Sequence, residues 1–190
     1  MRHKLVAGLL SACMGAVILT GCAPRVGLLY AFDLRTPEGY LPHPNMGFRS
    51  GDRFRMRIVP DQHCFIYVLH EGTDGTYSML FPLGIVEGGK NHVLAGQTIQ
   101  IPPTGNLAID EKAGIETLYV MASLAPIPEL ERLRGRETPV APDEFKLALK
   151  NIDIAYKISG ASKSTRMDQF THEVVKGSTI LKVDLKITHI

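Results

Sequence analysis

Hydrophobic and polar residues alternate along several stretches of the chain, and this period of two predicts β-strands. In the segment 53–58 three arginines alternate with apolar residues, and lysine, aspartate and threonine alternate with aliphatic residues over 181–188. Such strands bury one face and expose the other. The segment 64–69 is continuously apolar, which indicates a strand buried on both faces, and the β-propensity of 115–124 predicts a central strand.

Turn signals separate these strands, and helical patterns come late in the chain. The Gly-Thr-Asp-Gly sequence at 72–75 favours a hairpin. Apolar residues recur at helical spacing over 127–133 and again over 145–152, where the second run follows a Pro-Asp-Glu start. We therefore predict a mainly β fold, a β-sandwich-like domain of about seven or eight strands with two short helices at one edge. The pattern over 153–178 leaves the conformation there open.

The first 22 residues have the pattern of a bacterial export signal. A basic start precedes an apolar run over residues 5–19, which is shorter than the ~20 residues that a membrane-spanning helix needs. The run ends in Leu19-Thr20-Gly21-Cys22, which resembles the bacterial lipobox. This resemblance implies cleavage before Cys22, acylation of its sulfur and anchoring by lipid; the alternative is an ordinary signal peptide with an incidental cysteine. Because Ala23 and not an aspartate follows, it further implies the periplasmic face of the outer membrane.

These features divide the chain into three expected segments. They are a lipoprotein signal peptide over 1–21, a lipidated N-terminus and Pro/Gly-rich tether over 22–47, with one short strand at 26–34, and a single β-rich domain over 48–190. Removing 21 of the 190 residues would leave 169, with 19 basic and 19 acidic side chains once Arg2 and Lys4 are lost. This even balance excludes a nucleic-acid binder held by net positive charge.

A series of short motifs follows in a fixed order between residues 48 and 123. They are Phe48-x-Ser50-Gly51-Asp52-Arg53, Phe65-Ile66-Tyr67-Val68-Leu69, Asp74-Gly75-Thr76, Leu80-Phe81-Pro82, Asn91-x-Val93-x-Ala95-Gly96, Ile101-Pro102 and Gly114-Ile115-Glu116-Thr117-Leu118-Tyr119-Val120-Met121-Ala122-Ser123. In this order they resemble the bacterial envelope family named domain of unknown function 4384. The resemblance implies a compact β-rich module, found alone on lipoproteins or attached to other domains, and it supplies no catalytic residues. The motif residues therefore indicate architecture, with Tyr67 and Phe81 expected to fill a core.

Familiar patterns of catalysis and metal binding are missing from the sequence. The seven histidines form no HExxH motif and no pair at i, i+4, and neither GxxxxGK[ST] nor GxSxG occurs. Cys64 next to His63 could form a thiol or soft-metal site, but neighbouring residues on a strand face opposite sides. We therefore expect Cys64 to be a small buried hydrophobe. The prediction is that the protein has no catalytic residue, no metal site and no cofactor.

Arg53, Arg55 and Arg57 are the most distinctive polar feature, because on a strand they project from one face about 7 Å apart. One interpretation is a stripe that docks an anion or a partner. The other is a solvated sheet face, with the arginines paired to acidic residues on a neighbouring strand.

These observations lead to three hypotheses of function. The first is a non-catalytic outer-membrane lipoprotein that acts as an accessory or scaffold subunit of an envelope assembly of the secretion or motility type. It would touch the membrane through lipid on Cys22 and bind an envelope protein partner. The second is a periplasmic binding module for a glycan, a peptidoglycan fragment or a small ligand, although the absence of tryptophan weakens sugar stacking. The third is an unrecognised hydrolase, which would need a convergent polar cluster.

Overall fold

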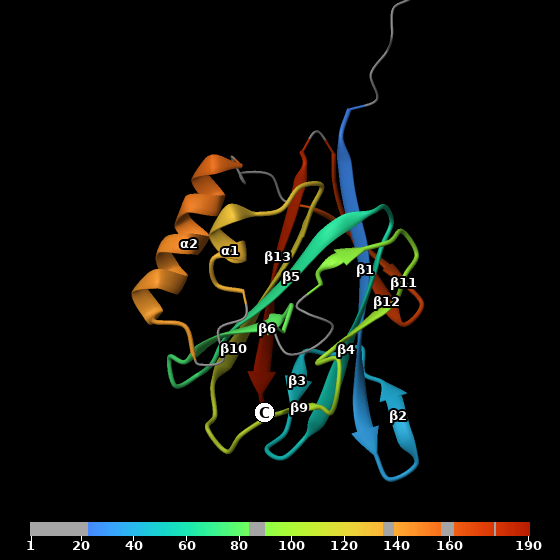
Figure 1. Cartoon of the computed structure of the whole chain (residues 1–190). Helices are drawn as coiled ribbons and strands as arrows, with labels where there is room; N and C mark the ends of the chain where they lie inside the picture. The colour runs from blue at the N-terminus through green and yellow to red at the C-terminus, as the bar shows by residue number, and fades with distance from the viewer. Residues whose placement is uncertain (1–22, 84–89, 135–138, 157–161, 177) are drawn as a thin grey trace, which may run out of the picture.

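Two β-sheets pack face to face, and two helices form a third layer on one side (Figure 1). The computed structural model describes residues 23–83, 90–134, 139–156, 162–176 and 178–190. One sheet has seven strands in the order β11-β12-β1-β4-β8, with β2 paired to β1 and β9 to β4. These strands are β11 (Lys163–Met167), β12 (Phe170–Lys176), β1 (Arg25–Thr36), β4 (Arg53–Pro60), β8 (Ile99–Ile101), β2 (Gly39–Pro42) and β9 (Leu107–Ala108).

The other sheet has six strands in the order β3-β13-β10-β5-β6, with β7 paired to β5. They are β3 (Gly47–Phe48), β13 (Ile180–His189), β10 (Ile115–Ser123), β5 (Cys64–Glu71), β6 (Tyr77–Phe81) and β7 (His92–Val93). β10 lies between β13 and β5, as its apolar sequence predicted for a central strand. β5 and β6 form the expected hairpin, in which Gly75 adopts the positive φ that the turn requires (φ 78°).

Alternation along the strands builds the main core between the two sheets. Phe54, Met56 and Ile58 of β4 point inward and are buried, as are the aliphatic residues of β13 at every second position. Cys64 lies on the inward face of β5 and is buried as a free thiol. The sequence-based prediction of a mainly β, β-sandwich-like fold is therefore confirmed.

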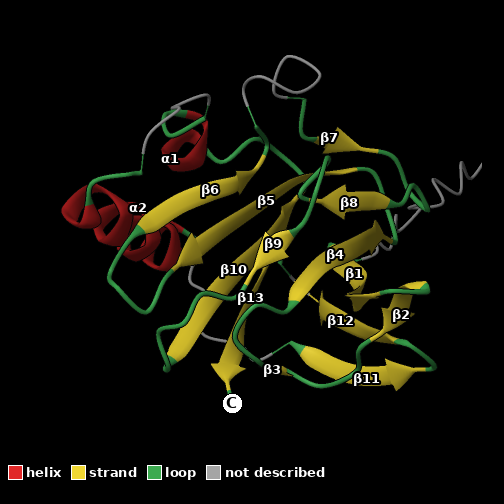
Figure 2. Ribbon diagram, turned by 90° about the horizontal axis from the view of Figure 1, so that it is seen from below, coloured by secondary structure: helices red, strands yellow, loops and turns green. Residues whose placement is uncertain are grey.

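A second core lies between the six-stranded sheet and the helices α1 (Pro128–Glu131) and α2 (Pro142–Ala155). Tyr67 and Leu69 of β5 and Met121 of β10 face outward from the sandwich and meet Phe145 of α2. The helices thus cover the part of the sheet face that β5, β6 and β10 form, and they do not lie along an edge (Figure 2). β5 and β10 are apolar on both faces because each lies between these two cores.

The structure corrects the expected tether. Most of residues 22–47 belong to the sandwich, because β1 is a 12-residue strand at the centre of the seven-stranded sheet, and β2 and β3 follow it. Both faces of β1 are largely buried, so its sequence has no strict alternation. The strand count is also higher than the seven or eight expected, with thirteen strands among the described residues. Several of the additional strands are only two or three residues long, too short for a period to be recognised.

The region left open in the sequence, 153–178, contributes the end of α2 and the hairpin of β11 and β12. The sequence also favours a loop over 82–89 and a charged connector over 134–138, and most of both segments lies outside the described residues. No helix in the described ranges is both long enough and apolar enough to cross a membrane.

Candidate functional site

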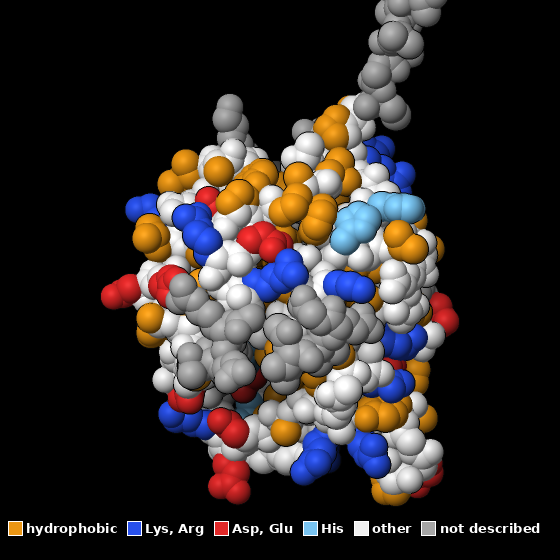
Figure 3. Space-filling view, viewed as in Figure 1, with side chains coloured by type: hydrophobic (Ala, Val, Ile, Leu, Met, Phe, Trp, Pro, Cys, Tyr) orange, Lys and Arg blue, Asp and Glu red, His pale blue; other side chains and the backbone are white. Residues whose placement is uncertain are grey.

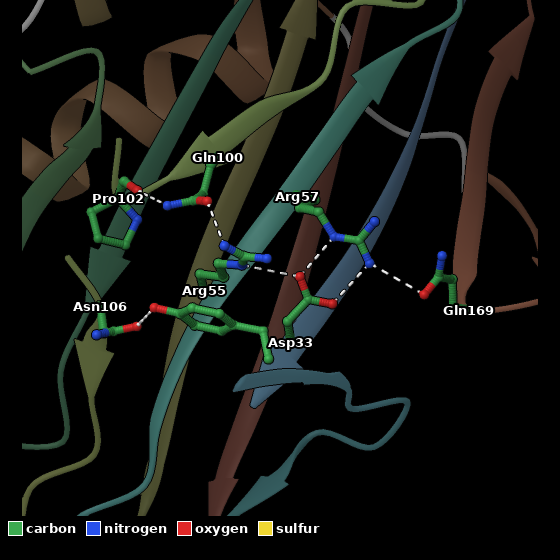
Figure 4. Close-up of polar contacts among 8 residues, drawn as sticks. Asp33, Arg55, Arg57, Gln100, Pro102, Asn106 and Gln169 are labelled. Atoms are coloured by element: carbon green, nitrogen blue, oxygen red, sulfur yellow. Dashed lines mark hydrogen bonds and ion pairs between the residues drawn. The ribbon is translucent and has the colours of Figure 1, made fainter. Parts of the chain in front are cut away.

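A cluster of charged side chains lies on the outward face of the seven-stranded sheet, opposite the side that carries the helices (Figure 4). Arg57 donates from Nε to Asp33 Oδ2 at 2.7 Å and from a terminal nitrogen to Asp33 Oδ1 at 2.8 Å. Arg55 donates from Nε to the same Asp33 Oδ2 at 3.2 Å. A single carboxylate therefore binds two guanidinium groups, one of them through a bidentate contact. We call Asp33, Arg55 and Arg57 the arginine cluster.

Strand register brings this cluster together. In the antiparallel ladder of β1 and β4, Asp33 lies opposite Arg55 and Ala31 lies opposite Arg57. Since side chains alternate along a strand, all of these residues face away from the main core. The alanine leaves room beside Arg57, so that its guanidinium can reach back to the aspartate two residues along β1.

Neighbouring polar and aromatic side chains hold both guanidinium groups in place. Gln100 of β8 accepts from Arg55 at 2.9 Å, and Gln169 accepts from Arg57 at 3.3 Å. The guanidinium carbon of Arg55 lies 3.7 Å from the ring centre of Tyr40, and that of Arg57 lies 4.8 Å from the ring centre of Phe170. Such cation–π contacts fix the planar groups against the sheet. Tyr40 is itself held by a 2.5 Å hydrogen bond from its hydroxyl to Asn106.

The predicted arginine stripe is thus divided into two parts. Arg55 and Arg57 are half-buried and paired to Asp33, whose side chain is only 4% exposed. This is the pairing with an acidic residue on a neighbouring strand that the alternative interpretation required. Arg53 is exposed and has no ion-pair partner among the described residues, and Arg35, two positions after Asp33 on β1, is also exposed. This part of the outward face therefore carries four arginines around Asp33, which leaves it positively charged.

A buried polar contact joins α1 to the second core. The hydroxyl of Tyr67 donates to Glu131 Oε1 at 2.6 Å and accepts from the backbone N–H of Ile127 at 3.0 Å. Asn91 and Arg134 also donate to the Glu131 carboxylate. Burial alone would raise the pKa of Glu131, but hydrogen bonds from Tyr67, Arg134 and Asn91 outweigh it and leave this pKa below its ordinary value. Tyr67 and Asn91 are motif residues, and here they serve architecture.

Cys64 and the histidines provide little support for a reactive site. Burial, followed by the negative charge of Asp61, raises the pKa of the Cys64 thiol to about 12. A thiol with that pKa is protonated at neutral pH and is a poor nucleophile. Within the described ranges, no group of three or more histidine, cysteine or acidic side chains is arranged to hold a metal ion.

One pair of residues that the sequence did not suggest lies at hydrogen-bond distance. Ser50 Oγ is 2.7 Å from His189 Nε2, and His189 Nδ1 is 2.9 Å from the backbone oxygen of Lys112. A serine beside a histidine can be activated as a nucleophile, but acyl transfer also needs free N–H donors for the oxyanion. The N–H groups of Gly51 and Asp52 in the same turn already donate to backbone carbonyls. The pair is 139 residues apart in sequence, so no local motif could have revealed it.

A small cavity of about 210 Å³ lies where the edges of β6 and β8 approach one another. Its lining includes Phe81 from the Leu-Phe-Pro motif and Gln100, which also contacts the arginine cluster. The volume falls below the ~300 Å³ at which sites for drug-sized ligands begin. It fits a few atoms of a ligand and not a glycan chain.

Comparison with known proteins finds a family that one segment of the chain resembles. Residues 47–126 match the family model described as Domain of unknown function (DUF4384). The matched segment begins at β3 and extends just past β10, so it includes Arg53, Arg55 and Arg57 but not Asp33. No curated protein and no solved structure matches the chain. The resemblance seen in the ordered motifs is confirmed, and the chain carries a domain similar to DUF4384.

Proposed function

We propose that the protein is a non-catalytic lipoprotein of the outer membrane that serves as an accessory or scaffold subunit of an envelope assembly of the secretion or motility type. The observation that supports this most is the positively charged outward face of the seven-stranded sheet. The helices cover much of the outward face of the other sheet, whereas no described helix covers the arginine-bearing face (Figures 1 and 4). Arg55 and Arg57 are pre-ordered by Asp33 and by aromatic rings, which lowers the entropy cost of using them in an interface.

The partner that fits this face carries an acidic surface. Arg35 and Arg53 are exposed and can pair with carboxylates of a partner, while the arginine cluster beside them supplies a rigid planar surface. Charge complementarity of this kind accelerates association and selects the partner. The interaction is therefore expected to weaken as salt is added, because salt screens exposed charges.

The test is charge reversal at the exposed arginines. Reversing Arg55 or Arg57 would place a second carboxylate beside buried Asp33 and disturb the fold, so the informative variant is Arg35→Glu with Arg53→Glu. A matched control, Lys112→Glu with Lys150→Glu, makes the same change in charge at exposed residues elsewhere. Both variants and the wild type are purified from detergent-solubilised envelopes after crosslinking, and each is melted. A specific partner lost from the arginine variant but retained by the control supports the proposal; equal recovery with an intact fold removes this face from consideration.

Lipidation requires a separate test at Cys22. A Cys22→Ser chain is expected to lose its label from a fatty-acid probe and to accumulate as an unprocessed or a soluble form, because it lacks the sulfur that would carry the lipid. Equal labelling of wild type and variant would contradict the lipobox interpretation.

A further inference from the structure

The beginning of β1 and the ends of several other strands lie together at one end of the sandwich. Arg25, the first residue of β1, lies opposite Lys176 at the end of β12, and Leu28 lies opposite Pro60 at the end of β4. β5 begins directly after the turn that follows β4, and Phe65 near its start lies opposite both His92 of β7 and Ser123 of β10. β7 and β10 run antiparallel to β5, so both end here, and the chain leaves them at Leu94 and Leu124. We call this the N-terminal end of the sandwich.

Exposed apolar residues from three separate segments meet at the N-terminal end. Leu94 is 52% exposed and Leu124 is 38% exposed. Exposed small apolar residues accompany them, namely Ala23, Pro24, Ala95, Ala125 and Pro126. β7 and β10 flank β5, so the two leucines are separated by about two strand spacings, or ~10 Å. Figure 3 shows hydrophobic side chains gathered at the end of the molecule from which the N-terminal trace leaves, with histidines beside them.

The start of β1 is firmly held at this end. The carboxylate of Asp61 accepts from the backbone N–H of Gly27 at 3.0 Å and from the Arg25 guanidinium at 3.1 Å. The side-chain amide of Gln62 donates to the backbone oxygen of Arg25. A Cβ on Gly27 would lie 2.5 Å from Asp61 Oδ2, so glycine is what permits this close contact. The chain is therefore fixed from Arg25 onward.

Only Ala23 and Pro24 separate this fixed residue from Cys22. Three residues of extended chain cover at most ~10 Å, so a lipidated Cys22 would hold the start of β1 within ~10 Å of the bilayer surface. Because the chain between a lipidated Cys22 and β1 is so short, one end of the domain would contact the lipid headgroups. That end is the one that carries the exposed leucines.

We infer that the N-terminal end of the sandwich is a membrane-contacting surface, which inserts Leu94 and Leu124 among the headgroups of a phospholipid bilayer. The inference rests on the lipid anchor proposed above and adds an orientation to it. Arg25 and Lys176, which are neighbours across the β1–β12 ladder, lie at the same end, where they can contact lipid phosphates. Membrane contact by a protein surface combines apolar burial at the headgroup boundary with such electrostatic attraction.

The experiment uses the full-length chain, expressed with its signal and reconstituted into vesicles of phosphatidylethanolamine with a minor share of phosphatidylglycerol. Single Leu94→Cys and Leu124→Cys variants carry an environment-sensitive dye, and a lipid-borne quencher reports contact with the bilayer. Cys64 does not compete for the dye because it is buried and its pKa is raised. Matched controls are Leu41→Cys and Ile115→Cys, since these residues are 53% and 59% exposed at the opposite end of the sandwich.

Dyes at positions 94 and 124 should be quenched at least about threefold more strongly than dyes at positions 41 and 115, because insertion reaches only ~5–10 Å into the membrane. Adding Leu124→Asp to the Leu94→Cys chain should reduce the quenching at position 94, because an acidic side chain is repelled by anionic lipid. Flotation of the same vesicles tests the anchor separately. A chain that floats but is quenched equally at both ends overturns the inference and leaves the anchor standing. A chain that does not float refutes the anchor, and the inference fails with it.

Discussion

Replacing Tyr67 by phenylalanine tests the contact that joins the helical layer to the sandwich. The substitution keeps the ring, which fills the second core, and removes only the hydroxyl. That hydroxyl donates to Glu131 and accepts from the N–H of Ile127, so its loss affects two groups at once. We expect the variant to fold and to be clearly less stable than the wild type.

The magnitude follows from these two hydrogen bonds. The N–H of Ile127 would lose its acceptor in a fully buried position, which costs ~1–3 kcal/mol. Glu131 would lose one hydrogen bond to its carboxylate but keep those from Asn91 and Arg134, which limits that loss to about 1 kcal/mol. The expected decrease in the free energy of unfolding is therefore about 3 kcal/mol. For a domain of this size it corresponds to a decrease in melting temperature of about 6–12 °C.

Denaturant unfolding at two pH values gives a second readout. The pKa of Glu131 is lowered in the folded protein, so its ionised form contributes stability above its ordinary pKa and loses this contribution as the pH falls through the folded pKa. The Tyr67 hydroxyl supplies part of that lowering, so the wild type has more of this stability to lose. The stability difference between wild type and Tyr67→Phe should be largest near neutral pH and smaller in acid.

Tyr156→Phe is the matched control, because the Tyr156 hydroxyl makes no hydrogen bond within the described ranges although its ring packs against the same core. It should change stability by less than about 0.5 kcal/mol. An equal effect of the two substitutions, or a Tyr67→Phe difference that grows in acid, would refute the assigned role of the Tyr67–Glu131 contact.

Two further predictions concern the sheets. Val120→Asp places an unpaired carboxylate in the main core, which costs several kcal/mol and should unfold the domain, whereas Lys163→Ala at an exposed position should not. A thermal melt distinguishes the two variants, and an unchanged melting temperature for Val120→Asp would contradict the β10 assignment. Asp33→Asn removes the carboxylate that two half-buried arginines share, and it should lower the free energy of unfolding, measured with denaturant, by about 2 kcal/mol. Arg53→Ala should leave this free energy almost unchanged, and equal effects of the two substitutions would mean that the arginine cluster does not stabilise the sheet.

The strands that could be predicted from the sequence are those with a clear local pattern. β4 and β13 bury one face each, so their alternation was visible in the sequence, and the Asp-Gly turn between β5 and β6 was equally local. β5 was recognised as buried on both faces from its continuous apolar run, and β10 was recognised as a central strand from its β-propensity. Which surfaces cover those faces could not be predicted, because periodicity does not distinguish a second sheet from a helix as the covering layer.

The features missed in the sequence depend on contacts between distant segments. A strand was expected at 26–34, but it was assigned to a tether because the surrounding prolines and glycines obscured its place in the sheet, where both of its faces are largely buried. The carboxylate that pairs with Arg55 and Arg57 lies 22 and 24 residues away on that same strand, so the arginines were found and their partner was not. The spacing of three arginines revealed a charged face, but only the β1–β4 register shows that Arg55 and Arg57 pair with Asp33, whereas Arg53 has no ion-pair partner among the described residues.

β1 connects the proposed membrane-contacting end of the sandwich to the proposed partner-binding face, so the position of one determines the position of the other. The strand begins next to the proposed anchor and contains Asp33 eight residues after Arg25, so the arginine cluster lies about 26 Å along the strand from the N-terminal end. β1 is hydrogen-bonded to neighbours on both sides, which means that this separation is rigid and that any pull on the lipid acts directly on the centre of the sheet. If the N-terminal end rests on the bilayer, the arginine-bearing face stands roughly perpendicular to it and is directed sideways. A partner bound there must carry its acidic surface about 25 Å into the periplasm, alongside the membrane and not embedded in it.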